Sequence, residues 1–163
     1  MKKMIAMLLV AVMVAAMFAG CGSSKPAADA PSAIKLGMCG PLTGGAAVYG
    51  TAVQAGMQIA VEEINAKGGL QFELNTQDDE HDTETAANAY NVLKDWGMQI
   101  MAGPVTTAPS NVVAAECAAD EIFMLTPSAS STKVIEGRDN VYQVCFTDPA
   151  QGAASAQYIF DHQ

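Results

Sequence analysis

The chain has 163 residues, of which 50% are hydrophobic, and a formal net charge of −9 at neutral pH. An acidic chain with only eight Lys and Arg residues lacks the basic patches that bind nucleic acid, which excludes that class of function. The same charge gives no electrostatic support for attachment to anionic lipid.

Residues 1–20 have the pattern of a secretory signal peptide. Lys2 and Lys3 precede an apolar run over 4–18, and Ala19-Gly20 stand before Cys21. This order is typical of a lipoprotein precursor, so we predict cleavage after Gly20 and lipidation of Cys21. An ordinary signal peptide followed by a chance cysteine is the alternative.

Residues 21–33 are rich in Ser, Pro, Ala and Gly and are expected to form a flexible linker. We therefore expect an exported protein, anchored to a membrane and facing the periplasm or the cell exterior.

The elements expected next are a strand, a helix and a second strand. The apolar segment 34–39 ends at the turn-rich segment 40–45. A helix over 49–67 is expected because five apolar residues recur at helical spacing and Gly68-Gly69 follow; they are Val53, Met57, Ala60, Val61 and Ile64. The second strand, 70–76, leads to the acidic segment 78–82.

A second helix should begin at Asp82 or Thr83, either of which is a good N-cap, and should end at Gly97. Its apolar stripe consists of Ala86, Ala89, Tyr90 and Leu93. The elements expected after it are a strand over 98–102, a helix over 108–120, a strand over 122–125, a short helix over 128–135, a strand over 141–145 and a last helix over 149–160.

Strands that alternate with helices predict an α/β fold, a doubly wound parallel sheet with helices on both faces. Ligands of such sheets bind beyond the carboxyl ends of the strands. The functional residues should therefore lie in the loops 40–49, 78–82, 103–110 and 126–132.

Two of these loops carry hydroxyl groups where helices begin. One loop contains Thr106-Thr107, and the other contains Ser128 and Ser130-Ser131. Helix starts bind anions, and a carboxylate fits here because neither loop contains Arg or Lys. Simple N-capping is the alternative for any one of these residues. Tyr49 could line a side-chain pocket or pack against the domain.

The remaining motifs favour no catalytic or metal chemistry. The loop 40–45 lacks the Gly-Lys-Ser/Thr of a phosphate-binding loop. The acids of 78–82, with His81, are expected to form a solvated helix start rather than a metal site.

Beyond Cys21, an odd number of cysteines remains: Cys39, Cys117 and Cys145. We expect them to be small buried apolar residues, with a disulfide as the alternative. Neither a cofactor nor an enzymatic activity is expected.

An ordered set of motifs resembles the branched-chain amino acid (Leu/Ile/Val) binding proteins of ABC importers. The set runs through Ile34-Lys35-Leu36-Gly37, Gly40-Pro41-Leu42-Thr43-Gly44, Tyr49-Gly50, Glu63-Ile64-Asn65-Ala66-Lys67-Gly68-Gly69, Asp78-Asp79, Gly103, Phe123-Met124-Leu125-Thr126-Pro127-Ser128-Ala129 and Gln151-Gly152. The resemblance implies a type I periplasmic binding protein, whose two lobes close over an amino acid and deliver it to a membrane permease.

The resemblance also implies residue roles. Thr107 would hold the ligand's α-carboxylate, Ser128 would offer backbone contacts, Ser130 would help to hold the zwitterionic head group, and Tyr49 would line the side-chain pocket. Some relatives have a disulfide that joins the acidic loop to the hydroxyl loop, but here those positions hold His81 and Thr106. By resemblance, 34–147 is the first lobe, 144–148 is the crossing segment, and 148–163 is the start of a truncated second lobe.

Three functions remain open at this point. The first is a lipid-anchored solute-binding protein that captures an amino acid and works with ABC permease subunits. The second is a sensor of the same fold that takes an amide or urea and signals through a partner protein. The third is an enzyme on a doubly wound sheet, which would need a catalytic dyad or a cofactor fingerprint.

Overall fold

The computed structural model describes residues 33–163. The predicted signal peptide, Cys21 and all but the last residue of the predicted linker lie outside the described residues. None of the helices within 33–163 is long and apolar enough to cross a membrane.

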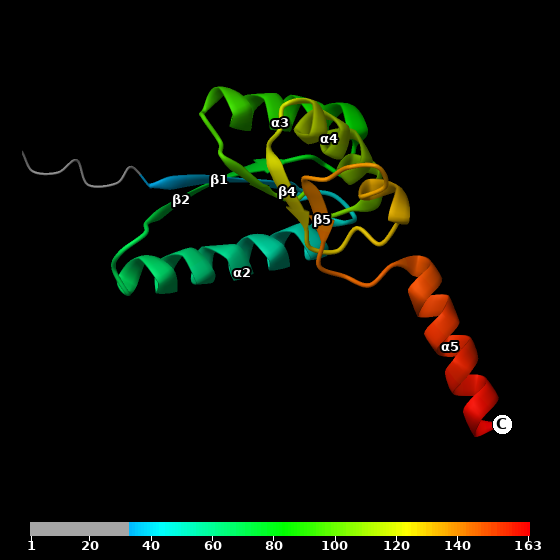
Figure 1. Cartoon of the computed structure of the whole chain (residues 1–163). Helices are drawn as coiled ribbons and strands as arrows, with labels where there is room; N and C mark the ends of the chain where they lie inside the picture. Colours follow the sequence, from blue (N-terminus) through cyan, green and yellow to red (C-terminus); the bar gives the residue numbers. More distant parts are fainter. Residues whose placement is uncertain (1–32) are drawn as a thin grey trace, which may run out of the picture. The chain divides into compact units, whose positions relative to one another are not determined.

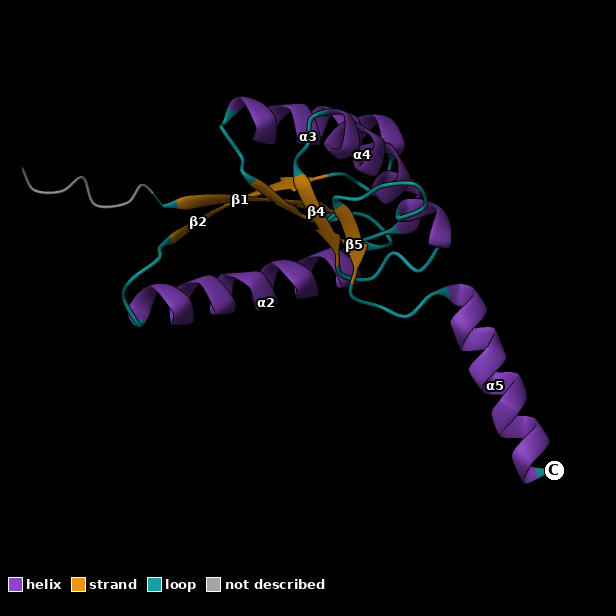
Figure 2. Cartoon of the chain, in the orientation of Figure 1, coloured by secondary structure: helices purple, strands orange, loops and turns teal. Residues whose placement is uncertain are grey.

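A five-stranded parallel sheet forms the centre of the molecule (Figure 2). Its strands are β1 (Ile34–Gly40), β2 (Phe72–Asp78), β3 (Ile100–Ala102), β4 (Phe123–Thr126) and β5 (Val141–Gln143). Their order in the sheet is β2-β1-β3-β4-β5. The predicted doubly wound α/β fold is confirmed.

Helices lie on both faces of the sheet (Figure 1). The helix α2 (Ala47–Ala66) covers one face, and α3 (Thr83–Asp95) and α4 (Thr107–Ala119) cover the other. A short 3-10 helix (Thr132–Val134) and the last helix, α5 (Asp148–His162), complete the described chain. The chain leaves β1 toward one face and β3 toward the other (Figure 1), and sheets of this kind bind ligands beyond the carboxyl ends of two neighbouring strands that diverge in this way.

The hydrophobic core lies between the sheet and the layer of α3 and α4. Tyr90 and Leu93 of α3, Met101 of β3, Val113 of α4 and Met124 of β4 are fully buried in it. The predicted stripe of α3 is buried as expected, and Asp82 caps the helix by accepting from the Thr85 amide at 2.8 Å.

The helix α2 differs from its prediction in burial. Of its expected apolar stripe only Val61 is buried. The helix packs on β1 and β2, and its other apolar residues border two shallow apolar pockets beside it, one of them shared with Ala102, Leu125 and Val144. The periodicity therefore located the helix correctly, but it could not indicate how much of the sheet face α2 would cover.

Several element boundaries also differ from the predicted ones. β2 begins at Phe72 rather than at residue 70, because Gly68 and Gly69 both adopt positive φ and prolong the turn. The expected helix over 128–135 is reduced to the three residues of the 3-10 helix. As a result Ser128 and Ser130 lie in a non-helical loop, where the backbone polar groups are not engaged in a helix.

Candidate functional site

The loops at the carboxyl edge of the sheet are joined to one another by side chains. At the end of β2, the Asp78 carboxylate accepts hydrogen bonds from the Leu42 amide at 2.8 Å and the Thr43 hydroxyl at 2.6 Å. Partial desolvation would raise the pKa of Asp78, but these bonds and one from the Glu80 amide outweigh it and lower the pKa. An ionised Asp78 therefore holds the loop after β1.

The two hydroxyl loops lie beside each other. The Ser128 hydroxyl donates to the Val105 carbonyl at 2.8 Å, two residues before Thr107. Gly103, with φ of +136°, lets the loop after β3 approach β1, because a Cβ there would stand 2.6 Å from the Cys39 carbonyl oxygen. The loop after β4 thus contacts the loop after β3, which in turn lies close to the end of β1.

Thr107 is the first residue of α4, and its amide points out of the helix start. Within residues 33–163, neither the Thr107 amide nor the Ala108 amide has a protein acceptor, and Pro109 has no N–H to offer. Thr106, the N-cap residue, makes no side-chain cap bond. Two free donors at the positive end of the helix dipole can bind a carboxylate.

The other two predicted site residues lie at the borders of this region. Ser130 is half-buried, and its carbonyl accepts from the Asp148 amide at 3.0 Å, which brings the start of α5 to the loop after β4. Tyr49 is 61% exposed in the first turn of α2. Packing of Tyr49 into the domain, the alternative considered from the sequence, is therefore wrong.

A set of buried hydroxyls behind these loops escaped the sequence analysis. The Thr126 and Ser110 hydroxyls both donate to the Pro104 carbonyl, at 2.6 and 2.9 Å, and Thr126 also accepts from the Ala129 amide at 3.3 Å. Both side chains are fully buried. They fix the position of each hydroxyl loop relative to the other. The Thr126-Pro127-Ser128 sequence marks the loop, but nothing in it indicates that Thr126 faces inward.

The two buried cysteines, Cys39 and Cys117, are poor candidates for a catalytic nucleophile. Cys39 and Cys117 are free and buried, Cys145 is free and half-buried, and burial raises the pKa of Cys39 well above its usual value and that of Cys117 to about 12. Thiols with such pKa values stay protonated and are weak nucleophiles. Burial likewise raises the pKa of Asp79. No cluster of three or more His, Cys, Asp and Glu side chains within 33–163 could hold a metal ion.

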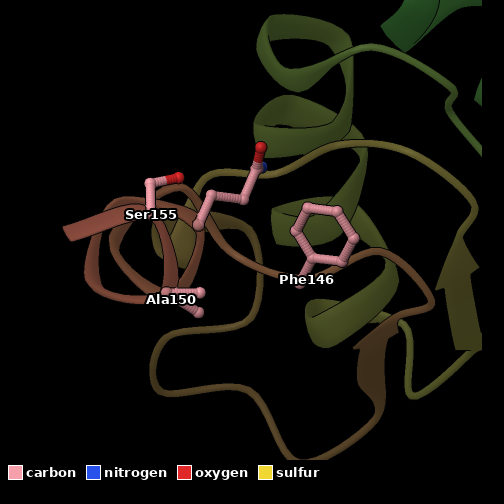
Figure 3. A pocket seen from close by; sticks show the side chains of 5 residues that line it. Phe146, Ala150 and Ser155 are labelled. Carbon is pink, nitrogen blue, oxygen red and sulfur yellow. The ribbon is translucent and has the colours of Figure 1, made fainter. Parts of the chain in front are cut away.

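An open cavity of about 590 Å³ lies next to this edge, beside the start of α5 (Figure 3). It is lined by Phe146 of the segment before α5 and by Ala150, Gln151, Ala154 and Ser155 of α5 itself. Phe146 is 68% exposed, and every residue of α5 is exposed. The cavity shares no lining residue with the hydroxyl loops, so we assign the candidate site to the loops, where the free donors are.

Comparison with known proteins relates the whole described region to one family. The model of the family described as "Periplasmic binding protein" matches residues 33–163. The Leu/Ile/Val-binding protein BraC3 of Rhizobium johnstonii is 35% identical over 130 residues, which are 77% of this chain and 35% of that protein. A leucine-, isoleucine-, valine-, threonine- and alanine-binding protein of Pseudomonas aeruginosa is 32% identical over 146 residues, 86% of this chain and 38% of that protein.

Solved structures give the same result. The leucine-binding protein LivK of Thermotoga maritima has a TM-score of 0.72 and 33% identity, over 79% of this chain and 37% of that one. LivJ of Streptococcus pneumoniae, solved with isoleucine, has a TM-score of 0.67 and 32% identity, over 71% of this chain and 34% of that one. The chain thus spans about a third of the length of these relatives. With its sheet and loops matched throughout residues 33–163, the chain belongs to the periplasmic binding protein family.

Proposed function

We propose that the chain forms the ligand-binding first lobe, 34–147, of an extracytoplasmic solute-binding protein that captures an amino acid for an ABC importer. The names of the relatives support a branched-chain amino acid: BraC3 is a Leu/Ile/Val-binding protein, and LivJ was solved with isoleucine. Residues 148–163 begin the second lobe in this proposal. The partners are the amino acid and the permease subunits in the membrane.

The observation that carries this proposal is the hydrogen bond from Ser128 to the Val105 carbonyl beside the open amides of Thr107 and Ala108. It brings hydroxyl groups from two loops next to two free N–H donors, without an Arg or Lys in either loop. Such a site suits a single carboxylate that arrives with its own ammonium group, rather than a phosphate.

The residue roles in this proposal are those that the family resemblance implies. The Thr107 hydroxyl and amide would donate to the ligand carboxylate, the backbone at Ser128 would contact it from the facing loop, and the Ser130 hydroxyl would help to hold the head group. Tyr49, exposed at the start of α2, would line the pocket for the ligand side chain. The protein would perform no chemistry, because closure of two lobes about a hinge is enough to enclose a ligand.

Titration of the chain with L-leucine, followed by amide NMR shifts, tests the proposal. One lobe must order the ligand without contacts from a second lobe, so we expect binding only in the millimolar range, with little or no heat in calorimetry. The shifts should centre on Thr107, Ala108 and Ser128. L-leucinamide, which lacks the carboxylate, should produce almost none of them, whereas an amide-binding sensor would favour it.

The matched variants are Thr107→Ala and Thr107→Ser. Loss of a hydrogen bond to a charged group costs about 1.5–3 kcal/mol, so Thr107→Ala should weaken leucine binding roughly tenfold or more, whereas Thr107→Ser should keep it. Unchanged affinity in Thr107→Ala, or leucine shifts confined to the cavity at Phe146, would contradict this site.

A further inference from the structure

The loop between β2 and α3 has a strained backbone. Glu80 and His81 adopt φ of +53° and +62°, a left-handed conformation that costs free energy in residues other than glycine. Three hydrogen bonds hold it: the Glu80 amide donates to Asp78 Oδ1 at 2.9 Å, the His81 amide to Asp79 Oδ1 at 2.9 Å, and the Asp82 amide to the Asp79 carbonyl at 2.8 Å. The carboxylates of Asp78 and Asp79 thus both help to maintain this turn.

The strained turn brings the His81 ring to the hydroxyl loop. His81 follows β2 and Thr106 follows β3, and these two strands flank β1 in the sheet. His81 Nδ1 lies 2.8 Å from the Thr106 hydroxyl oxygen. Thr106 is the N-cap residue of α4, but its side chain makes no cap bond. Since Pro109 occupies the third helical position and has no N–H, the amide left for a Thr106 cap is that of Ala108. The Thr106 hydroxyl is thus bonded to His81 and not to the Ala108 amide.

We propose that His81 is a positioning residue for the ligand site: by binding the Thr106 hydroxyl, it keeps the Ala108 amide uncapped and available to the ligand carboxylate. The ligand part of this inference rests on the function proposed above. The effect on the cap does not, because it concerns the free chain. Without His81, the Thr106 hydroxyl would turn to Ala108 and occupy the donor that the ligand needs.

Amide exchange of Ala108 with solvent, measured by NMR in the chain without ligand, tests the cap. His81→Gly removes the ring and accepts the left-handed backbone. We expect the Ala108 amide to exchange about fivefold more slowly in this variant, as it gains a hydrogen bond of about 1 kcal/mol. The slowing should disappear in His81→Gly with Thr106→Val, which has no hydroxyl. If His81 only braced the loop, the exchange of the Ala108 amide, which already lacks an acceptor, would not slow, and an unchanged or faster rate would overturn the proposal.

Titration with L-leucine tests the consequence for binding. His81→Gly should weaken the leucine affinity several-fold, while His81→Asn should retain it, because Asn tolerates positive φ and can place an amide atom where Nδ1 stands. Equal losses in both variants would show that the ring's own bulk matters, and would overturn the proposed role. If the unchanged chain gives no leucine shifts, the proposed function fails, while the exchange of Ala108 still decides whether His81 controls the cap.

Discussion

Asp78 and Asp79 are adjacent in the chain but have opposite electrostatic surroundings. Hydrogen bonds from exposed loop groups lower the pKa of Asp78, whereas burial raises the pKa of Asp79. Asp79 is fully buried, and its Oδ2 has no hydrogen-bond partner in the described part of the chain. An ionised carboxylate in such a place is costly, so Asp79 should lower the stability of the fold at neutral pH.

Asp79→Asn is therefore expected to change how stability depends on pH. The pKa of Asp79 is higher in the folded chain than in the unfolded chain. Its contribution to the free energy of unfolding is therefore fully present below the unfolded-state pKa and is lost as the pH rises through the folded-state pKa. Relative to Asp79→Asn, the chain should lose unfolding free energy as the pH rises from about 4 through the folded-state pKa of Asp79. Urea unfolding at a series of pH values measures this.

Asp78→Asn is the matched control with the opposite sign. Its folded-state pKa lies below the unfolded value, so its contribution is present above the unfolded pKa and is lost as pH falls through the folded one. Parallel pH profiles for the unchanged chain and Asp79→Asn would contradict the assignment of Asp79 as a destabilising buried acid.

At the scale of elements, the start of α2 is fixed closely against the loop after β1. Gly50 lies against the loop after β1, since a Cβ there would stand 2.0 Å from the Pro41 carbonyl oxygen. Asp78 holds the same loop through Leu42 and Thr43. The first turn of α2, which carries Tyr49, is thereby fixed at the edge of the candidate site, although most of the helix is exposed.

Two glycine substitutions in α2 separate these effects. Gly50→Ala should destabilise the chain by about 1–3 kcal/mol, because the methyl group has no room against Pro41. Gly56→Ala, where nothing lies within 4 Å of the new Cβ, should stabilise it by about 0.5–1 kcal/mol, as alanine favours the helix. Thermal or urea unfolding gives both values, and equal effects of the two changes would refute the close approach of α2 to Pro41.

The contrast between α3 and α2 explains which element predictions held. In α3 the apolar stripe, the Asp82 cap and the terminal glycine all indicated the same helix. The helix and its buried residues were therefore predicted correctly. In α2 the stripe was equally regular, but its burial depends on what covers the remaining sheet face. In the Ser128 segment, the Ser128 and Thr126 hydroxyls form hydrogen bonds with the loop after β3, and the Ala129 amide donates to the Thr126 hydroxyl, so the predicted helix does not form.

For the whole molecule, the predicted membrane anchor remains a proposal. In a bacterial host, the N-terminal peptide from the membrane fraction should begin at Cys21 and carry acyl chains, which mass spectrometry detects. Cys21→Ala should abolish this acylated species, whereas Cys145→Ala, which changes a thiol within the described part of the chain, should leave it unchanged. A mature chain that begins elsewhere, or an unmodified Cys21, would contradict lipidation.

The sequence alone determined the order of strands and helices, the parallel sheet and the choice of loops at its carboxyl edge, because these follow from local periodicity and from the handedness of crossovers. The tertiary structure decided which groups in those loops meet. The Ser128 bond to Val105, the His81 bond to Thr106 and the buried Thr126 hydroxyl join residues more than 20 positions apart. Such contacts depend on strand order and side-chain direction in space, which no local pattern encodes.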